Sequence, residues 1–206
     1  MPILFQHTIN NNTQLGVWKI EEQESFFTDQ LPALKLPSSP HKRRQHLAGR
    51  FLLQYFQPDF PIDQIHANPG NKPFLPNDAY HFSISHSHDM AAAIISKNLP
   101  VGIDIEFIAD KAKRVSQKFI HASETKWLEG AYEKDAHFHT TLLWSIKETV
   151  FKWYGLGNVD FKNDIQIQNL IDTSEIHIAE CFFKHTNPQT IDVNYFKIDE
   201  MILSWK

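Results

Sequence analysis

Residues 101–106 read Val-Gly-Ile-Asp-Ile-Glu and alternate strictly between branched apolar side chains and small or acidic ones. This period of two predicts a half-buried β-strand whose apolar positions face a core. Asp104 and Glu106 then stand on one face, about 7 Å apart along the strand, and their like charges repel unless a cation or water shields them. Gly102 has no side chain beside them, which leaves room for a bulky group to approach the backbone. An edge strand with a solvated acidic face is the plain alternative.

The rest of the chain shows strand patterns in blocks, with helical patterns between them. Alternation or short apolar runs predict strands near residues 3–8, 14–20, 80–85, 90–95, 165–167, 176–178, 191–195 and 201–205. Apolar side chains at helical spacing predict helices over residues 42–56, 123–132 and 140–154. Runs of strands beside runs of helices indicate an α+β fold and not an alternating parallel one.

The composition excludes several classes of protein. With 206 residues, of which 42% are hydrophobic and 13% aromatic, the chain has enough apolar surface to bury a core and is unlike a disordered chain. Its net charge of −4 gives no overall positive field for nucleic acid, and its one cysteine, Cys181, excludes an internal disulfide. No apolar run approaches the roughly 20 residues that span a bilayer, and the first residues lack the features of a signal peptide. We therefore expect a cytoplasmic monomer with no membrane or nucleic-acid partner.

A second charged pattern lies on the predicted helix over residues 140–154, which Gly155 and Gly157 end. Glu148 and Lys152 are four residues apart and share a helical face. The plain interpretation is a surface ion pair that contributes a few tenths of a kcal/mol. The functional interpretation adds Glu148 to the acidic pair of the strand as a third carboxylate for a metal ion, with Lys152 beside a phosphate. Mg²⁺ favours oxygen ligands and shares its coordination between carboxylates and substrate phosphates.

Together these two motifs resemble the signature of the 4′-phosphopantetheinyl transferases. The signature pairs Val-Gly-Ile-Asp-Ile-Glu, at residues 101–106, with Trp-Ser-x-Lys-Glu-x-x-x-Lys, at residues 144–152. The chain is similar in length to the surfactin-type branch, in which one chain carries two similar halves. Asn71 and Ser83 stand where this branch usually has glycine and asparagine. Further stretches that resemble segments of the branch are residues 71–74, 82–87 and 119–124.

The resemblance implies both a fold and a reaction. The fold is α+β, with two similar α/β halves of antiparallel sheets and packed helices in a pseudo-twofold arrangement. Residues 1–100 form the coenzyme A side, and residues 101–206 carry the metal-ligand strand and the Lys-Glu helix. The reaction transfers the 4′-phosphopantetheine arm of coenzyme A to a serine of an apo-carrier protein, acyl or peptidyl, and releases adenosine 3′,5′-bisphosphate. Mg²⁺ is the implied cofactor, and coenzyme A is the co-substrate.

The resemblance also assigns roles around the diphosphate of coenzyme A. Asp104, Glu106 and Glu148 match the Mg²⁺ ligands of the family, and the ion stabilises the leaving phosphate. Lys152 matches a lysine that contacts the diphosphate, and Lys147 is a secondary candidate for this contact.

Two further sets of residues follow from the same resemblance. Glu148 is the expected base for the attacking serine, directly or through water, and Glu124 is the alternative base. The segments that resemble coenzyme A contacts supply Lys72 and Pro73 beside the adenine, and Ser85 and His86 at a phosphate.

The predicted helix over residues 42–56 carries a basic cluster. Lys42, Arg43, His46 and Arg50 gather on the face away from the apolar side chains. A solvated basic flank is the plain interpretation. In a chain with negative net charge, however, such a cluster suits the 3′-phosphate of coenzyme A, because guanidinium groups bind phosphate through charge-assisted hydrogen bonds.

Two other functions use the same residues. A Mg²⁺-dependent phosphoanhydride hydrolase of nucleotide-like molecules needs the same carboxylates, and only a dependence on carrier protein separates it from a transferase. A non-catalytic protein that binds coenzyme A has no need for metal ligands, so the complete acidic set argues against it. The pairs His86/His88 and His137/His139 lack a third ligand set for structural zinc.

Overall fold

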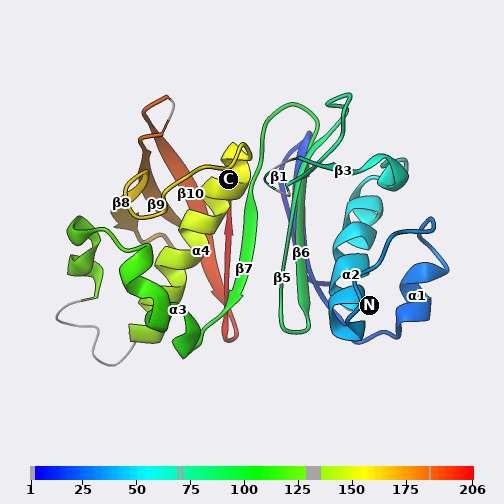
Figure 1. The fold of residues 1–206 in the computed structure, drawn as a ribbon, viewed down its shortest axis with the longest axis horizontal. Helices are drawn as coiled ribbons and strands as arrows, with labels where there is room; N and C mark the ends of the chain where they lie inside the picture. Colours follow the sequence, from blue (N-terminus) through cyan, green and yellow to red (C-terminus); the bar gives the residue numbers. More distant parts are fainter. Residues whose placement is uncertain (1–2, 69, 71, 129–135, 186) are drawn as a thin grey trace.

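The structure is a computed structural model that describes residues 3–68, 70, 72–128, 136–185 and 187–206. Two antiparallel sheets stand next to each other at its centre, with helices on the outside (Figure 1). The first sheet has the strand order β1 (Ile3–Asn10), β2 (Thr13–Lys19), β6 (Met90–Ser96) and β5 (His81–Ser87). The second has the order β7 (Ile103–Phe107), β11 (Met201–Trp205), β10 (Gln189–Ile198), β9 (His177–Phe183) and β8 (Ile165–Ile171). The predicted α+β class with antiparallel sheets is confirmed.

Helices cover the outer faces of both sheets (Figure 1). Helices α1 (Glu24–Thr28) and α2 (Pro40–Phe56) lie outside the first sheet, and α4 (Ala136–Tyr154) packs on β7 and β11 of the second, with α3 (Asp110–Val115) against it. The remaining short elements are the strands β3 (His66–Ala67) and β4 (Pro73–Phe74) and the 3₁₀ helices η1 (Ile62–Gln64), η2 (Ser116–Lys118) and η3 (Ala122–Trp127). In the described part of the chain, no helix has the length and apolar composition needed to cross a membrane.

The two sheets share a hydrophobic core between them. One face of β7 contributes to it with Ile103 and Ile105, which are 0% and 1% exposed, and Val101 precedes them in the same layer. Strands β2, β6 and β11 supply the other side chains of this layer, namely Leu15, Val17, Ala92, Ile94, Met201, Leu203 and Trp205. The alternation in residues 101–106 therefore predicts the buried face correctly. The opposite face of β7 is directed to α4, and this face carries the acidic residues.

Most predicted elements are present, and their bounds differ where local signals are weak. The hairpin of β1 and β2 and the helix α2 are confirmed, whereas α4 begins four residues before the predicted start. Over the predicted helix at residues 123–132 the structure has the 3₁₀ helix η3, which ends at Trp127, and residues 129–132 lie outside the described residues. Helices α1 and α3 are not predicted, because five or six residues are too few for helical periodicity to emerge.

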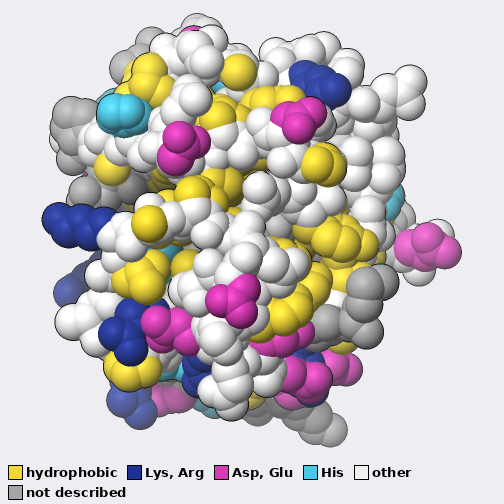
Figure 2. All heavy atoms as spheres, turned by 90° about the vertical axis from the view of Figure 1, so that its right-hand side faces the viewer, with side chains coloured by type: hydrophobic (Ala, Val, Ile, Leu, Met, Phe, Trp, Pro, Cys, Tyr) yellow, Lys and Arg dark blue, Asp and Glu magenta, His cyan; other side chains and the backbone are white. Residues whose placement is uncertain are grey.

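The outer surface of α1 and α2 carries both hydrophobic and polar side chains. Figure 2 shows the hydrophobic ones in patches among polar atoms. Phe26 and Tyr55 are 37% and 39% exposed. Both rings lie against Trp18, with centroids 6.4 Å and 6.3 Å from it. They form the outer edge of the aromatic cluster that attaches these helices to the first sheet.

Candidate active site between the two halves

Strands β5 and β7 lie side by side at the edges of the two sheets, and serine side chains link them. Ser85 Oγ donates to Asp104 Oδ1 at 2.8 Å, and Ser87 Oγ donates to Glu106 Oε2 at 2.8 Å. The two serines occupy alternate positions of β5, so both point to the same side of the strand. The two acidic side chains accordingly lie on one face of β7, as the alternation predicts.

Helix α4 lies directly on the start of β7. A Cβ atom on Gly102 would be 2.3 Å from the carbonyl oxygen of Thr149, so the helix can approach only because this residue is glycine. The bulky group that the sequence leads us to expect beside Gly102 is thus the helix itself. This contact brings Lys152 to the acidic strand, where its Nζ donates to Asp104 Oδ1 at 2.6 Å and to Ser85 Oγ at 2.9 Å.

The second oxygen of Asp104 has no hydrogen-bond partner. Oδ2 is buried, and the side chain of Asp104 is only 6% exposed. A buried carboxylate oxygen without a donor is costly and calls for a partner such as a cation. The cavity of about 340 Å³ at this point is lined by Ile84, Ser85, His86, Asp104, Ile105, Glu106, Trp144, Glu148 and Lys152.

These residues fit a hard cation that also binds phosphate. Among the described residues, no group of three or more His, Cys, Asp or Glu side chains is close enough to hold a metal ion alone. Mg²⁺ usually takes only one or two carboxylates and completes its shell with substrate phosphates and water. The unpartnered oxygen of Asp104, in one cavity with Glu106 and Glu148, agrees with that kind of site.

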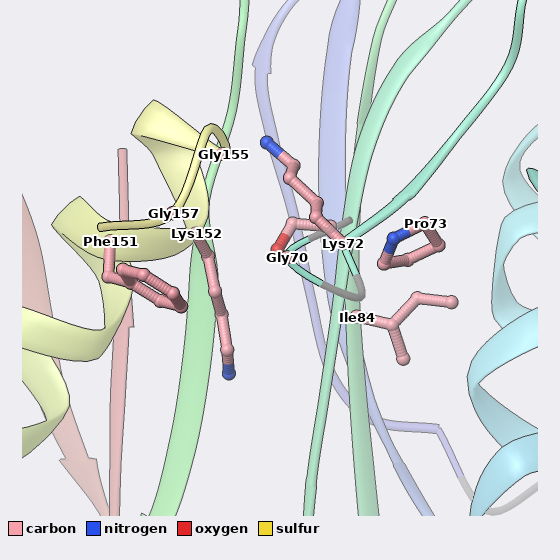
Figure 3. Close-up of a pocket in the computed structure, with 9 residues that line it drawn as sticks. Gly70, Lys72, Pro73, Ile84, Phe151, Lys152, Gly155 and Gly157 are labelled. Atoms are coloured by element: carbon pink, nitrogen blue, oxygen red, sulfur yellow. The ribbon is translucent and has the colours of Figure 1, made fainter. Parts of the chain in front are cut away.

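A second cavity, of about 180 Å³, lies between the two halves (Figure 3). Ile84 and Lys152 belong to the walls of both cavities. Lys72 and Pro73 reach the second cavity from the first half, and Phe151 lines it from α4. Its remaining lining residues are Gly70, Ser83, Gly155 and Gly157. The structure thus brings the predicted adenine segment and the predicted diphosphate lysine into one cleft.

The basic residues of α2 divide into two sets. Arg43 Nε donates to Glu24 Oε2 of α1 at 2.9 Å, and Lys42 is exposed. Burial, together with the nearby charges of Arg50 and His86, lowers the pKa of His46 to about 4. This second set, His46 and Arg50, is near His86 of β5, the strand that faces the acidic site, because His86 contributes to the pKa of His46.

Comparison with known proteins gives the family. Residues 100–202, half of the chain, match the model of the 4′-phosphopantetheinyl transferase superfamily. The chain belongs to this superfamily. The matched part contains the acidic strand β7 and helix α4. It therefore includes all the lining residues of the first cavity apart from those that β5 contributes.

Named relatives agree with this membership. The 4′-phosphopantetheinyl transferase gsp of Aneurinibacillus migulanus is 39% identical over 113 residues, which is 54% of this chain and 46% of the relative. The 4′-phosphopantetheinyl transferase psf-1 of Bacillus pumilus is 33% identical over 122 residues, or 55% and 51% of the two chains. A putative 4′-phosphopantetheinyl transferase of Haemophilus influenzae is 29% identical over 109 residues, or 50% and 45%. The chain spans about half the length of the curated relatives it matches.

Two predicted site residues of this superfamily member lie elsewhere. Lys147 and Glu124 form an ion pair of 2.7 Å whose side chains are both 0% exposed. Lys147 Nζ is also within 2.7–2.9 Å of three backbone carbonyl oxygens, and both carboxylate oxygens of Glu124 accept backbone N–H groups. Neither side chain has a surface that coenzyme A or a carrier serine can reach. Against the prediction of a diphosphate contact and an alternative base, we assign both a structural role that ties η3 and β8 to α4.

Sequence patterns contain signals that point to some of these placements. Lys147 follows the buried Leu143 by four residues and precedes the buried Val150 by three, so it falls on the apolar face of α4. The serines of β5 recur with a period of two, which places Ser87 beside Ser85 on the side of β7.

The two departures from the family pattern have different outcomes. Ser83 Oγ accepts a hydrogen bond from the backbone N–H of Ile103 at 3.2 Å, so this serine also helps to join β5 to the start of β7. It lines the second cavity as well. Asn71 lies outside the described residues.

Proposed function

We propose that this protein transfers the 4′-phosphopantetheine arm of coenzyme A to a serine of an apo-carrier protein, acyl or peptidyl, in a Mg²⁺-dependent reaction. Membership of the superfamily supports this class of transfer. The observation that carries the proposal is the state of Asp104: one oxygen is 2.6 Å from Lys152 Nζ, and the other is buried without a partner. A carboxylate in that state suits a site where a cation and a diphosphate meet.

The metal ion would be held by Asp104 with Glu106 and Glu148, and it would neutralise charge on the diphosphate. The side chain of Lys152 is 22% exposed and lines both cavities. It can therefore contact a diphosphate that extends from the acidic strand into the second cavity. As a cation it stabilises the charge that develops on the leaving phosphate. Ser85 fixes the position of Lys152 relative to Asp104, because its Oγ is hydrogen-bonded to both side chains.

The transfer step breaks one bond and forms one. The serine oxygen of the carrier bonds to the phosphorus that bears the pantetheine arm, and the bond from this phosphorus to the bridging oxygen breaks. Adenosine 3′,5′-bisphosphate leaves with the electron pair, and the serine proton passes to a carboxylate. Glu148 lines the cavity and is our proposed base, directly or through water. Glu124 is not available for this step, because its carboxylate is fully buried in the ion pair with Lys147.

Coenzyme A would lie along the two cavities, whose walls share Ile84 and Lys152. Its adenine end fits the smaller cavity, which Lys72 and Pro73 line from the first half and Phe151 from α4. Its 3′-phosphate fits the side of α2, where His46 is near both Arg50 and His86 of β5. We propose the partners that the resemblance implies, namely coenzyme A and a carrier protein. We also propose that the protein is a cytoplasmic monomer.

Intact-protein mass spectrometry tests the proposal. The purified protein is incubated with coenzyme A, MgCl₂ and several apo-carrier proteins, from fatty-acid, polyketide and nonribosomal peptide synthesis. We expect one phosphopantetheine per carrier, no gain on a carrier whose modified serine is alanine, and no gain in excess EDTA.

The amount of adenosine 3′,5′-bisphosphate separates the competing functions. A transferase releases it only when an apo-carrier is present. Release at the same rate without a carrier would make the protein a hydrolase. Binding of coenzyme A with neither release nor carrier modification, across all the carriers, would make it a non-catalytic binder.

A further inference from the structure

The segment around Asn68 and Lys72 in the first half closes over the end of α4 in the second half. Asn68 Nδ2 donates to the carbonyl oxygen of Gly155 at 2.6 Å, across the interface between the halves. Its Oδ1 accepts the backbone N–H of Lys72 at 2.9 Å, and its own N–H donates to the carbonyl of Lys72 at 3.0 Å. The amide of Asn68 is therefore fixed by its own loop while it holds the helix end.

Lys72 adds a second contact at the same place. Its Nζ lies 3.5 Å from the carbonyl oxygen of Trp153, in the last turn of α4. A cation at the carboxyl end of a helix is favourable, because unpaired carbonyl groups there carry partial negative charge. Burial lowers the pKa of Lys72 to about 8, because desolvation disfavours the charged ammonium group.

The helix end is shaped to receive these two side chains. Gly155 has φ +75°, in the left-handed region, and its N–H donates to the carbonyl oxygen of Phe151 at 2.9 Å. A Cβ atom on Gly155 would lie 2.7 Å from Lys72 Cδ. A side chain at position 155 would thus both strain the backbone and displace Lys72.

We propose that Asn68 is a positioning residue, whose bond to Gly155 fixes the last turn of α4 and thereby holds Lys152 against Asp104. Lys152 is three residues before Gly155 and lies within that turn. Without the bond the carbonyl of Gly155 loses its donor, the turn frays, and Lys152 loses its fixed distance to the acidic strand. This role rests on the proposed transfer reaction, since Lys152 acts there on the diphosphate.

The variant Asn68→Asp breaks the inter-half bond selectively. Aspartate keeps an oxygen that accepts the N–H of Lys72, but it places a carboxylate oxygen where the Gly155 carbonyl needs a donor. Asn77→Asp is the matched control, because Asn77 is exposed in the same half and its Oδ1 only accepts the N–H of Ala79 in a turn. We expect Asn68→Asp to lower the kcat of transfer about tenfold without changing the KM for the carrier, and Asn77→Asp to match the wild type.

Hydrogen exchange in the free protein tests the clamp without using activity. In Asn68→Asp, the amides of residues 152–155 should exchange faster than in the wild type, while those of β11 keep their protection. Unchanged exchange at residues 152–155 overturns the proposal, whatever the activity. If wild type and variant differ in exchange but the wild type modifies no carrier, the clamp stands and the transfer function fails.

A double-mutant cycle with Lys152→Ala decides whether Asn68 acts through Lys152. If it does, Asn68→Asp costs nothing further in kcat once Lys152 is alanine, because the group that it positions is gone. Equal fold-losses in the presence and absence of Lys152 overturn the positioning role and leave Asn68 as a structural contact only.

Discussion

Helix α4 contributes two lysines to two ion pairs. The pairs have similar distances but differ in solvent exposure and in their other hydrogen bonds. Lys147 Nζ and Glu124 Oε2 are 2.7 Å apart, and Lys152 Nζ and Asp104 Oδ1 are 2.6 Å apart. The first pair is 0% exposed on both sides, and every donor and acceptor in it is used. In the second pair Lys152 is 22% exposed, and Asp104 Oδ2 is buried without a partner.

The difference separates a structural pair from a functional one. A buried ion pair recovers its desolvation cost only when further hydrogen bonds satisfy both groups, as the backbone does around Lys147 and Glu124. In the pair of Lys152 and Asp104, one carboxylate oxygen can still accept a ligand. The pair also lies in a cavity with two further carboxylates, Glu106 and Glu148. Residues that a motif places five positions apart can therefore have unrelated roles.

The largest expected effect comes from breaking the fully buried pair of Lys147 and Glu124. Glu124→Gln should lower the free energy of unfolding by about 3–5 kcal/mol, because it leaves the charge of Lys147 buried without its partner. Urea denaturation followed by far-UV circular dichroism measures this loss. Lys152→Met is the matched control on the same helix and should cost less, because Lys152 is 22% exposed and Ser85 still donates to Asp104 in its absence. Equal losses in the two variants would mean that burial does not distinguish the pairs.

Breaking the pair of Lys152 and Asp104 should affect activity more than stability. We expect Asp104→Asn to slow transfer at least about 100-fold, or about 2.7 kcal/mol, because the amide removes the charge that faces both Lys152 and the proposed metal ion. The unfolding free energy should stay within about 1 kcal/mol of the wild type. Carrier modification at limiting Mg²⁺ measures the rate. A near-normal rate would remove Asp104 from the metal site and with it the functional half of the comparison.

Local periodicity explains how much of this could be predicted from the sequence. The alternation in residues 101–106 and the helical spacing around Glu148 depend on neighbours in the chain, so both elements and their acidic faces are predictable. The pairing of β5 with β7 through Ser85 joins segments from different sheets, and no local pattern specifies which edge strands meet. The same holds for Glu124, whose carboxylate pairs with a lysine 23 residues later.

The family motif also misled at one position for a physical reason. A motif records which residues recur, and a structural ion pair recurs as well as a catalytic one. Lys147 stands beside Glu148 in the sequence, but adjacent residues of a helix point about 100° apart. One side chain therefore faces the core, and the other lines the cavity.

A smaller effect should separate Arg50 from Arg43, two of the arginines of α2. Arg50→Ala should raise the KM for coenzyme A about tenfold, because a phosphate contact to a guanidinium contributes roughly 1.5–3 kcal/mol at most and is partly screened. The KM for dephospho-coenzyme A, which lacks the 3′-phosphate, should change little. Arg43→Ala is the control, since Arg43 already pairs with Glu24 of α1. Equal discrimination between the two substrates in wild type and Arg50→Ala would assign the 3′-phosphate elsewhere.

The smallest expected effect concerns His46 of α2, which is near Arg50 and His86. Its pKa in the folded protein is lowered to about 4, first by burial and then by Arg50 and His86, whereas an unfolded histidine titrates near 6.5. Between these two values the unfolded chain binds more protons, so the stability is complete above about pH 6.5 and decreases as the pH falls toward 4.

Substitution of His46 should remove this dependence. We expect the wild type to lose on the order of 1 kcal/mol more than His46→Gln between pH 7 and pH 4.5, a value reduced because the ring is only partly buried. Urea titrations at several pH values measure the two slopes. His66→Gln, at an exposed position of β3, should keep the wild-type slope. If His46→Gln and His66→Gln have the same slope, the ring of His46 is as well solvated as one on the surface, and other groups cause the loss of stability in acid.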